Sequence, residues 1–148
     1  MLNDMDEKDR RILALLRKDA KQRISQLAKK TGLPTTTVHN RIKRMEKGGI
    51  IRGYTVIPDY KKIGKAITAY ILITFERTPD KKYSQKDLAK RLKSFDEVEE
   101  VDIVTGETDI VIKVRVGDID ELDNLIINRL RSLPGVDKTR TMIVLSSV

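Results

Sequence analysis

The 148-residue chain contains no cysteine and no tryptophan, and His39 is its single histidine. The absence of cysteine excludes disulfide scaffolds, thiol nucleophiles and thiolate zinc sites, and one histidine excludes a histidine-rich metal site. No apolar run approaches the roughly 20 residues that a membrane span needs, and no basic-then-apolar signal opens the chain. From these absences we expect a cytoplasmic protein without a metal ion or cofactor.

Basic side chains are concentrated in the first part of the chain. The formal net charge is +8; residues 1–60 hold 14 Lys and Arg against 7 Asp and Glu, whereas residues 61–148 hold 16 against 15. A basic section joined to a nearly neutral one is typical of a protein in which only one domain binds nucleic acid. The alternative is an ordinary solvated, charged surface.

The basic section has the pattern of three short helices. Asp6 is placed to cap the first helix, and Gly32 to end a second helix that begins near Ser25. The apolar positions of the first helix share one face: Ile12, Leu13, Leu16 and Ala20. The spacing of residues 27–28, residues 32–33 and Val38 is that of a helix-turn-helix.

The third helix separates into an apolar face and a polar face. At about 100° per residue, Val38, Ile42 and Met45 share one direction, which we expect to be the core face. The opposite side has no acidic residue, with short polar groups early and cations late, as in a helix that reads base edges and holds phosphates. We predict that DNA is contacted by Thr35, Thr36, Thr37, His39, Asn40, Lys43, Arg44, Lys47 and Arg52.

Residues 50–57 alternate as a strand after Gly48-Gly49 ends the third helix. A strand in this place makes the helix-turn-helix a winged one, and Pro58-Asp59 stops it. We therefore predict a winged DNA-binding domain over residues 1–59, a hinge over 60–65 and a second domain over 66–148.

The second domain has the order strand, helix, strand, strand, helix, strand. These elements span residues 66–76, 85–95, 98–105, 109–116, 119–133 and 136–145. The βαββαβ order predicts a ferredoxin-like sandwich, so the whole chain is of the α+β class. Because two helices cover one face of such a sheet and the strands are apolar on both, we expect a second subunit on the bare face. Longer side chains or a loop covering it are the alternative.

Five motifs in the same order resemble the Lrp/AsnC, or feast/famine, family of transcription regulators. They are MDEKDRRIL at 5–13, VHNRIKRM at 38–45, GIIRGY at 49–54, VTGETD at 104–109, and LPGV at 133–136 with TRT at 139–141. The resemblance implies a winged DNA-binding domain, a C-terminal domain that binds small molecules and assembles subunits, and dimers that stack into octamers. It also implies a small effector, usually an amino acid, at contacts between dimers.

The resemblance places this effector around six residues: Gly106, Glu107, Thr108, Asp109, Thr139 and Thr141. Gly106 would let a ligand approach the backbone, and the Asp109 carboxylate would accept a hydrogen bond from an α-amino group. The alternative is an ordinary hairpin turn in which Asp109 caps its own backbone.

Two positions depart from the family pattern. Pro34-Thr35 stands where the family has Ser-Pro, so either Thr35 caps a later start of the third helix or this helix lacks a side-chain cap. Thr108 stands where an aromatic residue is most common, which leaves the identity of the effector open.

The sequence offers no constellation for an enzyme, because no nucleophile, metal site or tuned acid and base share a motif. We predict a sequence-specific, DNA-binding transcription regulator. Its expected partners are double-stranded DNA, an amino acid or similar small effector, and further copies of the chain as a homodimer or an octamer. The alternative is a stand-alone sensor or assembly protein that binds DNA without sequence preference.

Overall fold

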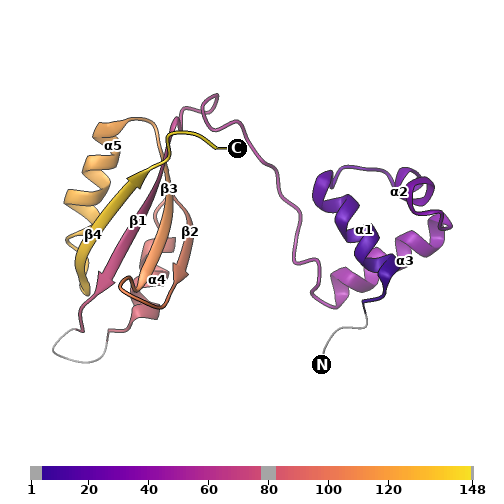
Figure 1. Cartoon of the computed structure of the whole chain (residues 1–148), viewed down its shortest axis with the longest axis horizontal. Helices are drawn as coiled ribbons and strands as arrows, with labels where there is room; N and C mark the ends of the chain where they lie inside the picture. The colour runs from indigo at the N-terminus through magenta and orange to yellow at the C-terminus, as the bar shows by residue number, and fades with distance from the viewer. Residues whose placement is uncertain (1–4, 78–82, 148) are drawn as a thin grey trace. The chain divides into compact units, whose positions relative to one another are not determined.

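The computed structural model describes residues 5–77 and 83–147, and the chain divides into two compact units, Met1–Ile57 and Pro58–Val148 (Figure 1). The first unit is helical and the second combines one sheet with helices, so the α+β class is confirmed. Each unit has its own buried cluster of apolar side chains.

Three helices form the first unit: α1 (Glu7–Lys18), α2 (Ile24–Thr31) and α3 (Thr35–Lys47). Asp6 caps α1 as predicted, because its carboxylate accepts a hydrogen bond from the Asp9 N–H and the Asp9 carboxylate accepts one from the Asp6 N–H. The small core consists of Ile12, Leu16, Leu27, Ala28, Val38, Ile42 and Met45. Ala20, predicted on the apolar face of α1, is exposed because the helix has already ended.

The turn between α2 and α3 is built by Gly32, whose φ of 71° lies in the left-handed region that glycine tolerates best. Pro34 then occupies the N-cap position of α3, and Thr35 is the first helical residue. No side-chain hydrogen bond caps α3. The sequence left open whether Thr35 caps a later start of the third helix or whether this helix lacks a side-chain cap. The structure shows the second arrangement.

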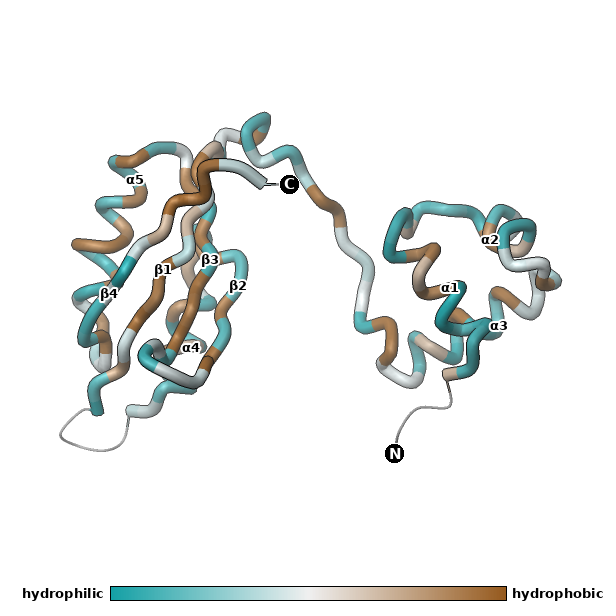
Figure 2. Tube along the Cα trace, in the orientation of Figure 1, coloured by the Kyte–Doolittle hydropathy of each residue, from teal (hydrophilic) through white to brown (hydrophobic). Residues whose placement is uncertain are grey.

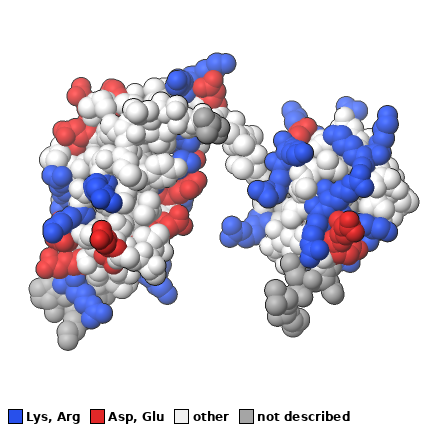
Figure 3. Space-filling model, viewed as in Figure 1, with Lys and Arg blue, Asp and Glu red and all other residues white. Residues whose placement is uncertain are grey.

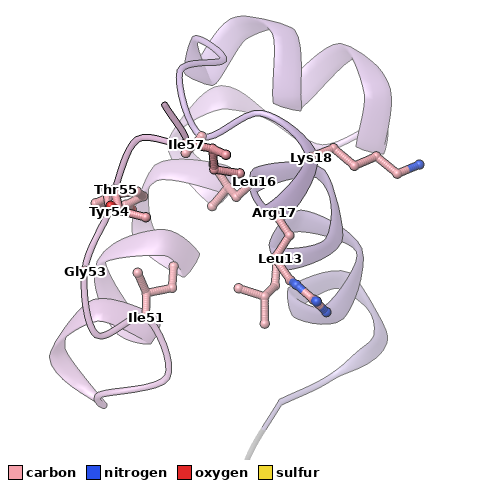
Figure 4. A pocket seen from close by; sticks show the side chains of 10 residues that line it. Leu13, Leu16, Arg17, Lys18, Ile51, Gly53, Tyr54, Thr55 and Ile57 are labelled. Atoms are coloured by element: carbon pink, nitrogen blue, oxygen red, sulfur yellow. The ribbon is translucent and has the colours of Figure 1, made fainter. Parts of the chain in front are cut away.

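The strand predicted over residues 50–57 does not form; this segment is irregular. Val56 and Ile57 are 84% and 94% exposed. A β-strand needs the backbone of a neighbour for its hydrogen bonds, and over the described residues 5–57 no other strand exists to supply them. Residues 51–57 instead border an apolar groove of about 400 Å³, with Leu13 and Leu16 of α1 on its other side (Figure 4).

The second unit is a four-stranded antiparallel sheet in the order β2-β3-β1-β4. Its elements are β1 (Ile67–Phe75), α4 (Gln85–Lys93), β2 (Val98–Ile103), β3 (Ile110–Val116), α5 (Ile119–Asn124), η1 (Leu125–Leu130) and β4 (Val136–Ile143). This is the predicted βαββαβ order. The helix expected over 119–133 is divided, because α5 passes into the wider π-helical turn of η1.

One face of the sheet is buried under the helices. Ala69, Ile71 and Ile73 of β1 are completely buried, and hydrophobic residues, brown in Figure 2, recur along β1 and β3. They pack with alternate residues of β3 and with apolar residues of the helices: Ile110, Ile112, Val114, Val116, Leu88, Leu92, Leu122, Leu125 and Leu130. Alternate residues of β1 thus share the buried face, as strand geometry requires.

The other face, which we call the open face, is apolar at its centre. The register places Tyr70 beside Met142 and Leu72 beside Val111, and Met142 is 48% exposed. In Figure 3 the side of this unit seen by the viewer has a broad area without charged side chains. Isolated apolar residues on a surface are ordinary, whereas neighbouring ones on adjacent strands form a patch.

Residues 60–65, where we predict a hinge, form a turn that is fastened to the second unit. The Arg115 guanidinium lies 3.8 Å from the centre of the Tyr60 ring, and the Tyr60 hydroxyl donates to Glu99. The Lys65 ammonium lies 2.7 Å from the Glu121 carboxylate, and this bond, with a second from the Gly117 N–H, lowers the pKa of Glu121. The turn 60–65 therefore belongs to the second unit, which begins at Pro58.

The entry to β4 depends on a glycine packed against an aromatic ring. Gly135 has a φ of 84°, and a Cβ added there would clash with the ring of Phe75. Gly64 has a similar φ of 78°, but nothing lies within 4 Å of the position of its Cβ.

We predict that Gly135→Ala lowers the free energy of unfolding more than Gly64→Ala does. Both substitutions place an L side chain in the left-handed region, which costs about 1–2 kcal/mol. Only Gly135→Ala adds the clash with Phe75, and overpacking costs at least about 1 kcal/mol more. Urea denaturation followed by circular dichroism measures the difference, and equal losses would contradict this packing.

Candidate functional site

The outer face of α3 carries most of the residues predicted to contact DNA. Val38, Ile42 and Met45 are buried as predicted, so the opposite side of the helix faces solvent. The exposed members of the predicted set are Thr35, Thr36, His39, Asn40, Lys43, Arg44 and Lys47 on α3, and Arg52 after it. Thr37 is half-buried. The helix thus brings eight of the nine side chains to one element, and Arg52 lies on the irregular segment that follows.

Basic side chains dominate the visible surface of the first unit, where acidic ones are few (Figure 3). Lys29 and Lys30 add to the cations of α3 from the last turn of α2. A surface of this kind attracts the phosphate backbone of DNA at long range, and its attraction weakens as salt is added.

A buried carboxylate joins α1 to α3. The Asp9 side chain is fully buried, and its two oxygens accept hydrogen bonds from Arg41 at 2.9 Å and Arg44 at 2.5 Å. Arg41 also donates to Asp6 at 2.7 Å. The bonds to Asp9 and Asp6 raise the pKa of Arg41, and the Asp9 N–H together with Arg41 lowers the pKa of Asp6. Both arginines come from α3, so this cluster sets the rotation of the helix about its own axis.

The cluster changes the interpretation of Arg44. We predict Arg44 as a DNA contact from its place on the polar face, but in the structure one of its nitrogens is bonded to Asp9 while 56% of its side chain stays exposed. Sequence reasoning missed Asp9 and Arg41. The signal was present, because Asp9 precedes Ile12 and Leu16 by three and seven residues and therefore lies on the apolar stripe of α1.

The segment after α3 is tied back to that helix. The Tyr54 hydroxyl donates to the Glu46 carboxylate at 2.7 Å. Partial burial of Tyr54 and the neighbouring negative charge of Glu46 raise the pKa of this tyrosine to about 12. Glu46, the one acidic residue of α3, is thereby engaged with Tyr54.

In the second unit, Asp109 holds the turn 106–109 to its surroundings. Its carboxylate accepts hydrogen bonds from the Phe75 N–H at 2.8 Å and from the Gln85 side chain at 2.7 Å. The turn is thus joined to the end of β1 and the start of α4. In the hairpin alternative, the Asp109 carboxylate accepts a hydrogen bond from the backbone of its own turn. This is wrong, because the backbone N–H that it binds belongs to Phe75. An α-amino group would have to compete with both donors.

A depression of about 410 Å³ lies beside this turn on the open face. It is lined by Leu72, Thr74, Glu107, Thr108, Lys138, Thr139 and Arg140. Three residues of the predicted effector set are among them, whereas Gly106, Asp109 and Thr141 are not. Gly106 shapes the turn, with a φ of 117°.

The register of β4 places Thr139 and Thr141 on the same, buried face of the sheet, because they pair with the buried Ile73 and Ile71. Of these two, Thr139 lines the depression and Thr141 does not. Arg140 pairs with Leu72 on the open face. Sequence reasoning missed Lys138 and Arg140, although strict alternation about Thr139 indicates that they point to the other side.

Two further features of the described residues bear on function. No group of three or more His, Cys, Asp or Glu side chains in residues 5–77 and 83–147 could hold a metal ion. Over the same ranges, no helix has the length and apolar character to cross a membrane.

Comparisons with known proteins match both units. A family model described as "Lrp/AsnC ligand binding domain" matches residues 68–148, and one described as "Winged helix-turn-helix DNA-binding" matches residues 5–52. An HTH-type transcriptional regulator of Pyrococcus furiosus is 42% identical over 139 residues, which are 94% of this chain and 91% of the relative. The HTH-type transcriptional regulator FL11 of Pyrococcus abyssi is 38% identical over 143 residues, 97% of this chain and 91% of the relative.

Solved structures share the whole architecture. AsnC of E. coli is 32% identical with a TM-score of 0.81, over 98% of this chain and 95% of that one. A transcriptional regulator of Neisseria meningitidis, in complex with L-Met, superposes with a TM-score of 0.90 at 23% identity, over 97% of this chain and 92% of that one. The second likeness shows the fold alone.

We predict that Asp9→Asn destabilises the first unit by about 2 kcal/mol, because a buried acceptor of charged hydrogen bonds is weakened while Arg41 keeps its charge. Glu7→Gln is the matched control, since it removes an exposed carboxylate from the same turn of α1. Urea denaturation of each variant measures the change. A loss for Asp9→Asn no larger than for Glu7→Gln would show that the cluster does not hold α1 to α3.

Proposed function

Because this chain belongs to the Lrp/AsnC family of transcription regulators, we propose that it binds particular operators through α3 and that a small effector controls its assembly and its DNA binding. It is a transcription regulator with a DNA-binding helix-turn-helix and an Lrp/AsnC ligand-binding domain, and not an enzyme. The operator, the effector class and the assembly are the proposed parts.

One observation carries the DNA-binding proposal. The core face of α3 is closed by Val38, Ile42 and Met45, and the Asp9 cluster holds its rotation, so Asn40 and Lys43 are exposed together on the outer side. An amide such as that of Asn40 reads adenine through paired hydrogen bonds in the major groove. An ammonium such as that of Lys43 neutralises a backbone phosphate, and this contact does not depend on the base sequence.

Dimerisation through the open face is the second part of the proposal. Tyr70, Leu72, Val111 and Met142 form an apolar patch there, and covering it with a second copy removes apolar surface from water. A symmetric dimer carries two copies of α3. Its operator is then a pseudo-palindrome whose half-sites lie about one helical turn, or a multiple of it, apart.

The effector is proposed to bind at the depression lined by Glu107, Thr108 and Thr139, in the unit that matches the ligand-binding family model. In this proposal Asp109 positions the turn and is not itself a ligand. Effector binding that favours one state of assembly, such as an octamer over a dimer, changes operator affinity by about 1–3 kcal/mol, the usual size of such coupling.

We predict different effects for two substitutions on α3. Asn40→Ala should relax the sequence preference at one operator position, because it removes a base-edge contact. Lys43→Ala should weaken binding to all sequences and lower the slope of log K against log salt by about 1, because it removes one phosphate contact. Both are measured by fluorescence anisotropy over a salt series, on an operator selected from random DNA.

Lys90→Ala is the control, since it removes an equally exposed cation from α4. If no operator emerges from selection, and binding is weak and independent of sequence, the stand-alone sensor with non-specific DNA binding is correct. If both α3 variants bind with unchanged affinity and slope, the recognition surface lies elsewhere.

We predict that Met142→Asp in the full chain yields a monomer, because a charge at the centre of a self-contacting apolar patch meets its own copy across the interface. Ile127→Asp is the matched control: Ile127 is 44% exposed against 48% for Met142, but it lies on η1. Light scattering during size-exclusion chromatography gives the mass of each variant. A Met142→Asp dimer at micromolar concentration would exclude the open face as the dimer interface.

A further inference from the structure

The depression beside the turn 106–109 has an uneven set of charges. Its lining includes two cations, Lys138 and Arg140, and one carboxylate, Glu107. The remaining lining side chains are neutral: Leu72, Thr74, Thr108 and Thr139. An amino acid has one ammonium and one carboxylate on its α-carbon, so one cation of the depression is left without a counterpart.

The two cations are held close by the strand. Lys138 and Arg140 are two residues apart on β4 and line the same depression, which sets their Cα atoms about 7 Å apart. Both side chains are exposed, and neither makes an ion pair with a described residue. Two like charges that line one depression repel each other, and an anion bound between them relieves the repulsion.

The neighbouring polar groups are already engaged in ways that keep this pair in place. The Thr74 hydroxyl donates to Asp137 and accepts from the Lys138 N–H. The Thr139 hydroxyl accepts from Arg131, on the side of the helices. The Thr108 hydroxyl makes no hydrogen bond with a described group, so Thr108 and Glu107 are the neutral and acidic groups that a ligand can use.

We infer that the effector of this protein is an amino acid with an acidic side chain, glutamate or aspartate. This inference rests on the proposed function, which places the effector at this depression. Glu107 accepts hydrogen bonds from the α-ammonium, one cation binds the α-carboxylate, and the other binds the side-chain carboxylate. A neutral side chain leaves one cation unmatched, and a lysine or arginine side chain places a third positive charge beside the pair.

The test measures affinities for the full chain by isothermal titration calorimetry, with thermal shift in parallel. The ligands are glutamate, aspartate, glutamine, asparagine, lysine, glutarate and inorganic phosphate. Glutamate or aspartate should bind roughly tenfold or more tightly than the corresponding amide, which differs in charge at nearly constant shape. Glutarate, which lacks the ammonium, should bind more weakly than glutamate.

Arg140→Gln and Lys138→Gln should each remove most of the preference for glutamate over glutamine. Lys90→Gln, which removes a cation from α4, should leave this preference unchanged. Two separate variants keep the test valid if one of them fails to fold.

The other outcomes are distinct. Tightest binding of a neutral or basic amino acid, lost in Thr108→Ala, overturns the acidic class but leaves the proposed effector site standing. If phosphate or glutarate binds as tightly as glutamate, the depression is a general anion site, and the acidic class is overturned in this case too. If no amino acid binds at all, the effector part of the proposed function fails together with this inference.

Discussion

The buried carboxylate of Asp9 is the interaction on which the arrangement of the first unit depends. A carboxylate removed from water must be matched by cations, and both of its partners, Arg41 and Arg44, belong to α3. Among the described residues, the apolar core of this unit has seven buried side chains, so it restrains the rotation of a 13-residue helix weakly. Hydrogen bonds have preferred directions, so the bonds to Asp9 restrain the rotation of α3 in a way that apolar packing does not. With that rotation fixed, Asn40 and Lys43 are directed outward.

The second unit is governed by the two faces of its sheet. The buried face is closed by α4, α5 and η1, whereas Tyr70 and Met142 are paired on the open face, where Met142 is 48% exposed. One surface therefore presents an apolar centre for a second copy and, along β4, the cations Lys138 and Arg140. The proposed assembly and the proposed effector site lie on the same face, which gives a direct physical route by which a ligand can influence assembly.

Each end of the segment between the units is held by a hydrogen bond from a tyrosine hydroxyl to a glutamate carboxylate. Tyr54 donates to Glu46 of α3, and Tyr60 donates to Glu99 of β2. Each tyrosine hydroxyl thereby joins one end of the segment to the rigid part of its own unit. The few residues between Tyr54 and Tyr60 contain the covalent connection between the two units, and they include the exposed Val56 and Ile57.

Sequence alone determined the features that depend on neighbours along the chain. The caps at Asp6 and Gly32, the core face of α3, the phase of β1 and the βαββαβ order follow from local periodicity and turn chemistry, and all are observed. The tertiary structure alone decided what depends on distant partners. The apolar alternation of residues 50–57 predicts a strand, but a strand requires a neighbouring backbone that this unit does not provide. The partners of Asp9, Asp109 and Arg140 were also decided by the fold, because they lie 24 to 68 positions away along the chain and only folding brings them within bonding distance or into register.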